Sequence, residues 1–321
     1  MSSALPGFND ATMSVDHLPD ELLSLIFEYA GLNMLHNDEP SSVWFSSQVS
    51  FRWSHIIHHT PSVWCYVPIY RRSNLNLPQL HFEKSRHYPL SIYLNVRARG
   101  ANLVHALQCM VEQSERWYTL IIRVPDAPTL STIISRLRRT CAPRSKHFEL
   151  YVDAPQHTIG QLPEVFQDGF AQLTSLTLRG RAFNLRSPLL SRLRSLTLCH
   201  LPQLQGHPPH HTFQELLGAS PKLEYLALDG VFPYLSLGIE YDEILVPALQ
   251  VLDIRMQCQG WRQFISILKL PCLNRLTFTS SETSVWRSFE SSLSILAANV
   301  GPLQELHLNV LSREPPFVDW S

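Results

Sequence analysis

A short leucine pattern that returns along most of the chain constrains the fold more than any other feature. The pattern is Leu-x-x-Leu-x-Leu, and its clearest copy runs from Leu173 to Leu178. Five further copies begin at Leu193, Leu223, Leu249, Leu273 and Leu303. Looser copies precede them at residues 90–94, 117–122 and 147–152. A unit repeated about every 20 to 30 residues predicts stacked copies of one structural element.

Each copy reads as a short β-strand. Alternate side chains of a strand point to the same face, so Leu176 and Leu178 would point inward while Thr177 and Arg179 point outward. One such strand cannot bury its apolar face alone, and stacked copies form a parallel sheet with a shared core. Helical patterns between the copies would cover the other side, at residues 103–111, 130–137, 261–270 and 285–298. We therefore predict an α/β fold.

The pattern is similar to that of leucine-rich repeats, in divergent form because the Asn that usually follows the last Leu is absent. The resemblance implies a leucine-rich-repeat-like α/β solenoid, a horseshoe, over residues 88–321. Residues 206–211 and 232–246 are predicted to be long loops between copies. A solenoid end needs a cap, which Phe317 and Trp320 could supply by folding back.

A different pattern occupies the N-terminal part, after residues 1–15, which are small and polar and are predicted to be disordered. Pro19 suits the first position of a helix, and Asp20 and Glu21 suit its positive end. Gly31 is predicted to end this helix. Two more helices are expected at residues 41–49 and 51–58. Helices this short carry more large apolar side chains than they can bury among themselves, so the surplus must meet another surface.

The residues of this region resemble an F-box, in the form found in F-box proteins of mushroom-type fungi. The resemblance rests on Leu18-Pro19-x-Glu21-Leu22-Leu23-x-x-Ile26-Phe27, followed by Val49-x-x-x-Trp53 and Pro61-x-x-Trp64. Ser50 and Phe51 depart from the Cys and basic residue that often follow the Val in the family. The F-box domain would span residues 16–66, with a connector at 67–87 that holds a helix from about Pro78 to Ser85.

The resemblance implies the substrate-recognition subunit of an SCF-type cullin–RING ubiquitin ligase, without catalytic residues or cofactor of its own. The F-box would dock on the adaptor subunit, and through it on the cullin, and the repeats would present a protein target. The expected adaptor-binding residues are Leu18, Pro19, Leu22, Leu23, Ile26, Phe27, Val49 and Trp53. Strand parity alone suggests outward residues for target contact, namely Arg179, Asp229, Asp253, Arg255, Arg275 and His307.

Composition narrows the classes of partner. The net charge of −1 argues against a broad electrostatic grip on nucleic acid or on acidic membranes. No apolar run reaches 18 residues, and the N-terminus does not read as a secretory signal. The six cysteines form no Cys-x-x-Cys pair and read as small buried residues of a reducing compartment. We expect a cytoplasmic or nuclear protein.

The sequence contains only weak signals of a metal-binding or catalytic site. His55, His58 and His59 could be metal ligands but fit a helix end better, and His207, His210 and His211 lie in a Pro-rich stretch without a nearby Cys or carboxylate. Asp16 with Glu21, or Asp242 with Glu243, could form carboxylate pairs, although capping and solvation explain them better.

Several alternatives stay open. Trp64 could be an interface anchor or a core residue. The N-terminal helices could merely cap a repeat scaffold. A doubly wound α/β enzyme would need a glycine-rich turn after an early strand, and the sequence has none.

Overall fold

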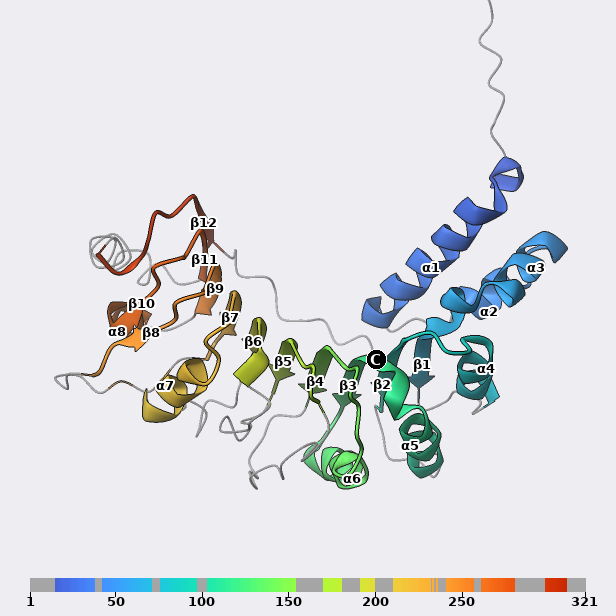
Figure 1. Ribbon diagram of the computed structural model, residues 1–321, viewed down its shortest axis with the longest axis horizontal. Helices are drawn as coiled ribbons and strands as arrows, with labels where there is room; N and C mark the ends of the chain where they lie inside the picture. The colour runs from blue at the N-terminus through green and yellow to red at the C-terminus, as the bar shows by residue number, and fades with distance from the viewer. Residues whose placement is uncertain are drawn as a thin grey trace, which may run out of the picture. The chain divides into compact units, whose positions relative to one another are not determined.

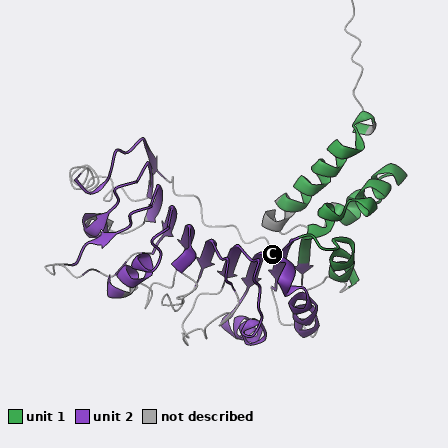
Figure 2. Cartoon of the chain, viewed as in Figure 1, with its two compact units in different colours: residues 1–68, 76–88 green, residues 69–75, 89–321 purple. Residues whose placement is uncertain are grey.

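The chain folds as an α/β protein around a parallel sheet of ten strands (Figure 1). This computed structural model describes residues 15–37, 42–70, 76–96, 103–153, 170–180, 191–199, 210–231, 233, 235, 241–256, 261–280 and 298–310. Two compact units divide the chain (Figure 2). Unit 1 comprises residues 1–68 and 76–88, and unit 2 comprises residues 69–75 and 89–321.

Unit 1 is mostly helical. Its elements are η1 (Val15–His17), α1 (Asp20–Asn37), α2 (Ser42–Ser46), α3 (Phe51–His59), η2 (Pro61–Cys65) and α4 (Asn76–Lys84). Strand β1 (Tyr66–Tyr70) crosses the boundary between the units in sequence. The three predicted N-terminal helices are confirmed in number and order. The predicted connector helix is also present as α4, but it belongs to unit 1, where it packs on η2.

Helix α1 starts as expected and ends later than expected. Asp20 and Glu21 occupy its first turn, directly after Pro19. The prediction that Gly31 ends the helix is wrong, because α1 continues to Asn37. Gly31 is instead a buried helical residue beside Tyr66, where an added Cβ would lie 2.9 Å from the ring atom Cδ2. Its missing side chain therefore serves close packing rather than termination.

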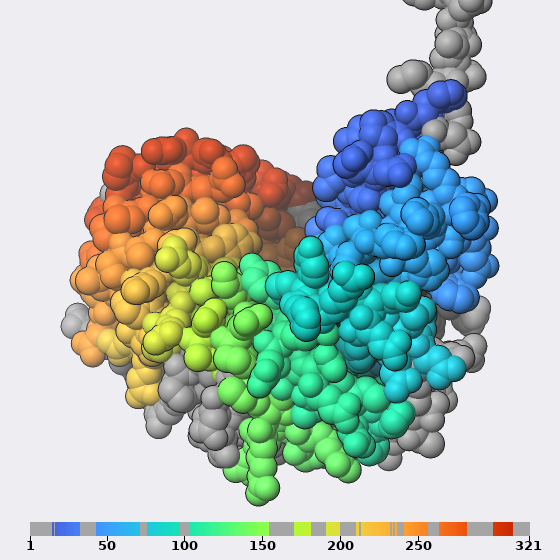
Figure 3. All heavy atoms as spheres, turned by 45° about the vertical axis from the view of Figure 1, so that its right-hand side comes forward, coloured from blue at the N-terminus to red at the C-terminus, as the bar shows by residue number. Residues whose placement is uncertain are grey.

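Unit 2 contains the sheet. The strands are β2 (Leu90–Asn95), β3 (Trp117–Val124), β4 (His147–Val152), β5 (Ser175–Arg179), β6 (Ser195–Cys199), β7 (Tyr225–Asp229), β9 (Val251–Met256), β11 (Arg275–Ser280) and β12 (Glu305–Val310). With β1 at one edge, they lie in chain order. Every copy of the leucine pattern contributes one strand, so the predicted parallel sheet is confirmed. In the space-filling view the colours of unit 2 follow one another from green to red, because each strand lies against its neighbours in sequence (Figure 3).

The register between strands places equivalent leucines side by side. Leu176 is paired with Leu196, and Leu196 with Leu226, and the same alignment continues through Leu252 to Leu276. All five side chains are buried, at most 7% exposed. Residues between the leucines face the other side of the sheet, as strand alternation requires.

Helices α5 (Leu103–Glu112), α6 (Ala127–Leu137) and α7 (His210–Gly218) lie along one side of the sheet (Figure 1). Helices α5 and α6 match the predicted helical stretches. Helix α8 (Trp261–Ile267) is shorter than predicted, because β10 (Leu268–Lys269) follows and pairs with β8 (Ile244–Leu245). Phe213 of α7 meets Phe264 of α8 edge to face, with ring centroids 5.4 Å apart.

Some predictions about the connecting segments are wrong. Residues 206–211 were expected to form a loop, yet His210 and His211 begin α7. Its buried residues Phe213, Leu216 and Leu217 show the helical spacing that could have revealed it. The expected loop at residues 232–246 contains strand β8. The cysteines are free where described, but only Cys65 is buried, while Cys141 and Cys272 are exposed.

Other predictions fall outside the described residues. These are the disorder of residues 1–14, nearly all of the helix expected at 285–298, and the cap expected from Phe317 and Trp320. The disorder predicted for Val15 is wrong, because this residue begins η1.

Candidate partner-binding surfaces

Helix α1 is apolar on two sides, and the two sides have different surroundings. Leu23 and Phe27 are buried, with 0% and 3% exposure. Leu22 and Ile26, each one residue earlier, are about half exposed, at 46% and 49%. The sequence had suggested that all four residues share one face. A helix turn of 3.6 residues separates them into an inner pair and an outer pair.

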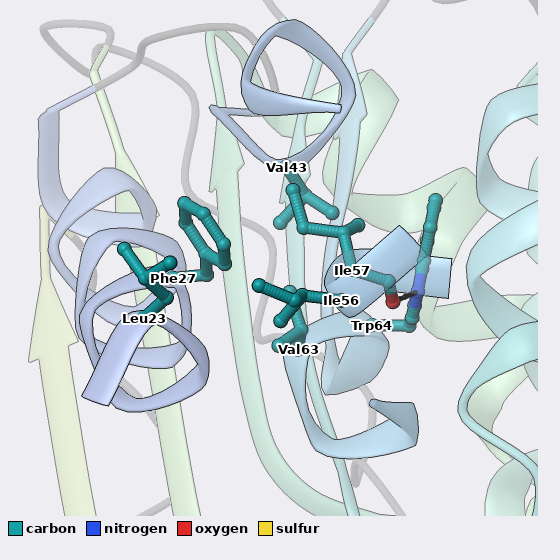
Figure 4. Close-up of a cluster of buried hydrophobic side chains, with 7 residues drawn as sticks. All are labelled: Leu23, Phe27, Val43, Ile56, Ile57, Val63 and Trp64. Carbon is teal, nitrogen blue, oxygen red and sulfur yellow. Dashed lines mark hydrogen bonds between the residues drawn. The ribbon is translucent and has the colours of Figure 1, made fainter. Parts of the chain in front are cut away.

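The inner pair belongs to the core of unit 1. Leu23 and Phe27 point from α1 toward side chains of α2, α3 and η2 (Figure 4). The cluster consists of Leu23, Phe27, Val43, Ile56, Ile57, Val63 and Trp64. The expectation that Leu23 and Phe27 form part of a contact surface is therefore corrected. They are covered by the unit's own helices and support the surface from beneath.

Trp64 is a core residue, which decides between the two roles that the sequence left open. Its side chain is fully buried, and its Nε1 donates a hydrogen bond of 2.8 Å to the carbonyl of Ile57 (Figure 4). The ring of His58 stacks on it at 5.6 Å, and the ring of His81 meets it edge to face at 5.1 Å.

The two histidines beside Trp64 are kept neutral. Burial lowers the pKa of His81 to about 4, although its Nδ1 lies 3.1 Å from the carbonyl oxygen of Trp64. Burial, together with Lys84 and His59, also lowers the pKa of His58. The core of unit 1 thus holds His81 as an uncharged imidazole at neutral pH.

Outside this core, unit 1 exposes an unusual number of large apolar side chains. Helix α1 carries an outer row, the α1 stripe, of Leu22, Leu25, Ile26, Tyr29 and Leu32. Helix α2, the turn after it and the first residue of α3 carry a second set, the α2 group, of Trp44, Phe45, Val49 and Phe51. Within the described part of the chain, ten of the sixteen exposed large apolar side chains lie between residues 15 and 51. Single exposed apolar residues are ordinary on a soluble protein, but such a concentration indicates a surface that another molecule covers.

The other expected adaptor-binding residues take intermediate positions. Leu18 and Trp53 are half-buried and pack against the edge of the core, where the Trp53 ring meets Phe27 edge to face at 5.0 Å. Pro19 is exposed, and Val49 is 63% exposed. Of the eight expected residues, Leu22, Ile26 and Val49 thus carry the exposed apolar surface.

Sequence reasoning missed most of the remaining exposed residues. Leu25 and Tyr29 follow Leu22 at helical spacing, which was a usable signal. Trp44, Phe45 and Phe51 gave no such signal, because a helix as short as α2 has no clear periodicity.

Polar contacts fix the helices that carry this surface. Arg52 of α3 forms an ion pair with Asp20, with 2.5 Å between Nη2 and Oδ1, and also donates to the carbonyl of Leu18 at 2.5 Å. Ser50 caps α3 by accepting a hydrogen bond from the backbone N–H of Trp53 at 3.1 Å. Ser62 of η2 donates to Glu28 of α1. The bonds of Arg52 thus tie the start of α1 to α3, and the bond of Ser62 ties α1 to η2.

A second candidate surface is the face of the sheet opposite the leucines, the polar face. Strand alternation places all six residues suggested for target contact on this face, and five of them alternate with buried leucine, isoleucine or phenylalanine positions. His307 lies on the edge strand β12, where its neighbours Leu306 and Leu308 are themselves 43% and 46% exposed. The register pairs Asp229 with Arg255, and their ion pair measures 3.6 Å between Oδ2 and Nη1. Arg275 and His307 both contact Glu305, at 2.5 Å and 3.3 Å.

The histidine and carboxylate groupings have ordinary structural partners. His55 and His59 stack at 4.1 Å within α3, and His210 packs on Tyr241. Glu243 pairs with Lys269 at 3.1 Å. Among the described residues, no three His, Cys, Asp or Glu side chains gather as a metal site would require. The side chains of Asp16 and His207 lie outside the described set.

Comparison with protein families and with curated sequences identifies no relative. No protein-family model matches the chain, and no curated protein sequence shows a significant match to it. Among the described residues, no helix is both long enough and apolar enough to cross a membrane.

Proposed function

We propose that this chain is a target-recognition subunit of an SCF-type cullin–RING ubiquitin ligase, and that unit 1 is an F-box that docks on the adaptor subunit. The observation that carries the proposal is the exposure of the α1 stripe and the α2 group above a complete small core. Docking on the adaptor would remove these side chains from water, at a gain of roughly 25 cal/mol per Å² of apolar surface buried.

Unit 2 takes the other role in this proposal, as a leucine-rich-repeat-like solenoid that presents a protein target. Support comes from the one strand that each leucine copy contributes and from the chain order of those strands. The polar face, with Arg179, Asp229, Asp253, Arg255, Arg275 and His307, would contact the target. The chain performs no covalent step in this mechanism. It holds the target where the ligase partners transfer ubiquitin to a lysine.

The test is binding of the full chain to purified adaptor subunit, measured by titration calorimetry. Leu22→Asp and Ile26→Asp each place a charge on the exposed stripe and should abolish detectable binding, because a buried unpaired carboxylate costs several kcal/mol. Both side chains are half exposed, so the fold should survive, which circular dichroism checks.

Val104→Asp is the matched control, since Val104 is 44% exposed on α5 of unit 2. It should bind like the unaltered chain. Adaptor binding that persists in Leu22→Asp would contradict the docking proposal. If the unaltered chain does not bind the adaptor at all, the repeat-scaffold alternative replaces it, and removal of residues 1–66 should then unfold the repeats.

A further inference from the structure

Helix α3 carries a row of three exposed rings on one side. Phe51, His55 and His59 follow one another at intervals of four residues, which places them on the same face of the helix. All three residues are exposed, and Phe51 is 90% exposed. The ring centroids of Phe51 and His55 lie 6.5 Å apart, and those of His55 and His59 lie 4.1 Å apart. The two imidazoles therefore lie side by side at the surface of unit 1.

A hydrogen bond to the backbone sets the orientation of the His59 ring. Its Nδ1 lies 2.8 Å from the carbonyl oxygen of His55, and a carbonyl oxygen can only accept. Nδ1 therefore carries the proton of the neutral imidazole, and Nε2 is left unprotonated. Metal-binding histidines commonly have this arrangement, in which one ring nitrogen donates to a carbonyl and the other binds the metal.

His58, the third histidine of this segment, does not belong to the row. It precedes His59 by one residue, which turns it by about 100° around the helix. Its ring stacks on the buried ring of Trp64, with 5.6 Å between the centroids. The structure thus separates one histidine with a packing role from two that share the exposed side of α3.

Charges near the end of α3 do not favour a bound cation by attraction alone. Arg52, three residues before His55, is paired with Asp20. Burial, followed by the charge of Lys84, lowers the pKa of His58, so this cation acts near the helix end. The negative end of the helix dipole has the opposite effect, but it amounts to a partial charge. An ion held here must therefore form coordinate bonds to imidazole nitrogen.

From this geometry we infer that His55 and His59 chelate one divalent transition-metal ion, such as Ni²⁺, Cu²⁺ or Zn²⁺, at the surface of unit 1. Imidazole nitrogen suits these ions, whereas Mg²⁺ and Ca²⁺ prefer oxygen ligands. Two histidines four residues apart on one helix are also the zinc-binding pair of the His-Glu-x-x-His motif.

The chelate is open rather than closed. Closed metal sites take three or four protein ligands, and no group of that size occurs among the described residues. Water, or a group of a bound partner, completes the coordination of the ion. The inference does not depend on the proposed function, because it uses only the geometry of α3.

The experiment is calorimetric titration of the full chain with nickel chloride near neutral pH, with magnesium chloride as the second probe. Ni²⁺ is the main probe, because exposed thiols such as Cys141 and Cys272 compete more strongly for Zn²⁺ and copper. We expect His55→Gln and His59→Gln each to weaken the tightest binding of Ni²⁺ by about tenfold or more, since each leaves a single imidazole. Mg²⁺ should not bind at this site.

His105→Gln is the matched control. His105 is an exposed histidine of α5 that has a thiol four residues later, with 3.8 Å between its Nε2 and the Sγ of Cys109. The variant should bind Ni²⁺ like the unaltered chain. A loss of affinity in His105→Gln as large as that in His59→Gln would contradict a site on α3.

A second measurement locates the ion without any substitution, and decides the matter if circular dichroism shows that a variant is not folded. Modification of histidines by diethyl pyrocarbonate, mapped by mass spectrometry, should be slowed by Ni²⁺ at His55 and His59. It should be unchanged at His87, which is also exposed. Unchanged affinity in a folded His59→Gln, binding of Mg²⁺ as tight as that of Ni²⁺, or equal protection of all three histidines would overturn the inference.

Discussion

Units 1 and 2 differ in how completely they bury their apolar side chains. In unit 2 the inner strands bury one set of side chains, since Leu226 and Leu228 of β7 are at most 1% exposed while Tyr225 and Asp229 face away from the core. The edge strand β12 leaves Leu306 and Leu308 about half exposed. In unit 1, helix α1 is apolar on both sides, and only the inner side finds a partner within the unit. A strand in a stack is covered by the shared core, whereas three short helices have too little surface to cover one another. The exposed outer side of α1 is the observation on which the proposed docking of unit 1 rests.

The largest expected effect compares the two sides of α1. Leu23→Ala should lower the free energy of unfolding by about 2–5 kcal/mol, because it leaves a cavity in the core. Ile26→Ala should change it by less than about 0.5 kcal/mol, because that side chain is half exposed. Urea denaturation followed by tryptophan fluorescence measures both. An equal loss of unfolding free energy in the two variants would contradict the contrast between a buried inner side and an exposed outer side of α1.

A second effect concerns pH and is specific to unit 1. The unfolded chain protonates His81 as the pH falls below about 6.5, while the folded chain does so only near its pKa of about 4. Its contribution to stability is therefore complete above pH 6.5 and declines as the pH falls toward 4, by about 3 kcal/mol in all. Urea denaturation between pH 7 and pH 4 measures the decline, and His81→Gln should flatten it. An equally steep profile in that variant would assign the dependence to other groups.

Glycines provide a third comparison. Gly180, at the end of β5, has φ +89°, and an added Cβ would lie 2.1 Å from the carbonyl oxygen of Val152. Gly180→Ala should cost roughly 2–3 kcal/mol, since both the backbone and the neighbour resist it. Gly230→Ala shares the positive φ, at +71°, but meets nothing within 4 Å, and should cost about 1 kcal/mol. Thermal unfolding ranks the two, and a reversed order would contradict the close approach at β5.

Gly31 of unit 1 lies within a helix, so adding a Cβ there should cost less than at the end of β5. Gly31→Ala should change stability by no more than about 1 kcal/mol, because the gain in helix propensity offsets the contact with the Tyr66 ring, which can turn aside. A loss as large as that of Gly180→Ala would show that the packing of α1 is as rigid as the sheet.

The last comparison tests whether the units unfold separately. Ser50 caps α3 in unit 1, and Asp126 caps α6 in unit 2 by accepting from the N–H of Thr129 at 2.8 Å. Ser50→Ala and Asp126→Ala should each cost about 1 kcal/mol. Amide hydrogen exchange should place each loss in its own unit. A loss spread over both units by either variant would mean that they unfold as one.

Sequence alone predicted most of the sheet, and the reason is physical. Alternation with a period of two, repeated in copy after copy although the spacing between copies is irregular, leaves one arrangement that buries Leu176 and its equivalents together. Helix α7 was not predicted, because Pro208 and Pro209 directly precede it and favour a loop. Strand β8 was not predicted, because its apolar run is only a few residues long.

The candidate surface on unit 1 was harder to derive. The motif identified the helix correctly, but the inner and outer sides of α1 are both leucine-rich, so pattern could not separate Leu23 from Leu22. Only the positions of α2, α3 and η2 decide which side is covered.

The chain order of the strands has a consequence for how such a sheet can change length. Because β5, β6 and β7 share one register, excising the segment from Ser175 to Arg194 would bring Ser195 to the place of Ser175 and leave every remaining strand with a matching neighbour. Duplication of the same segment would add a strand without disturbing the others. A sheet of this kind can therefore become longer or shorter by whole repeats, and the charges of its polar face can vary independently of its core.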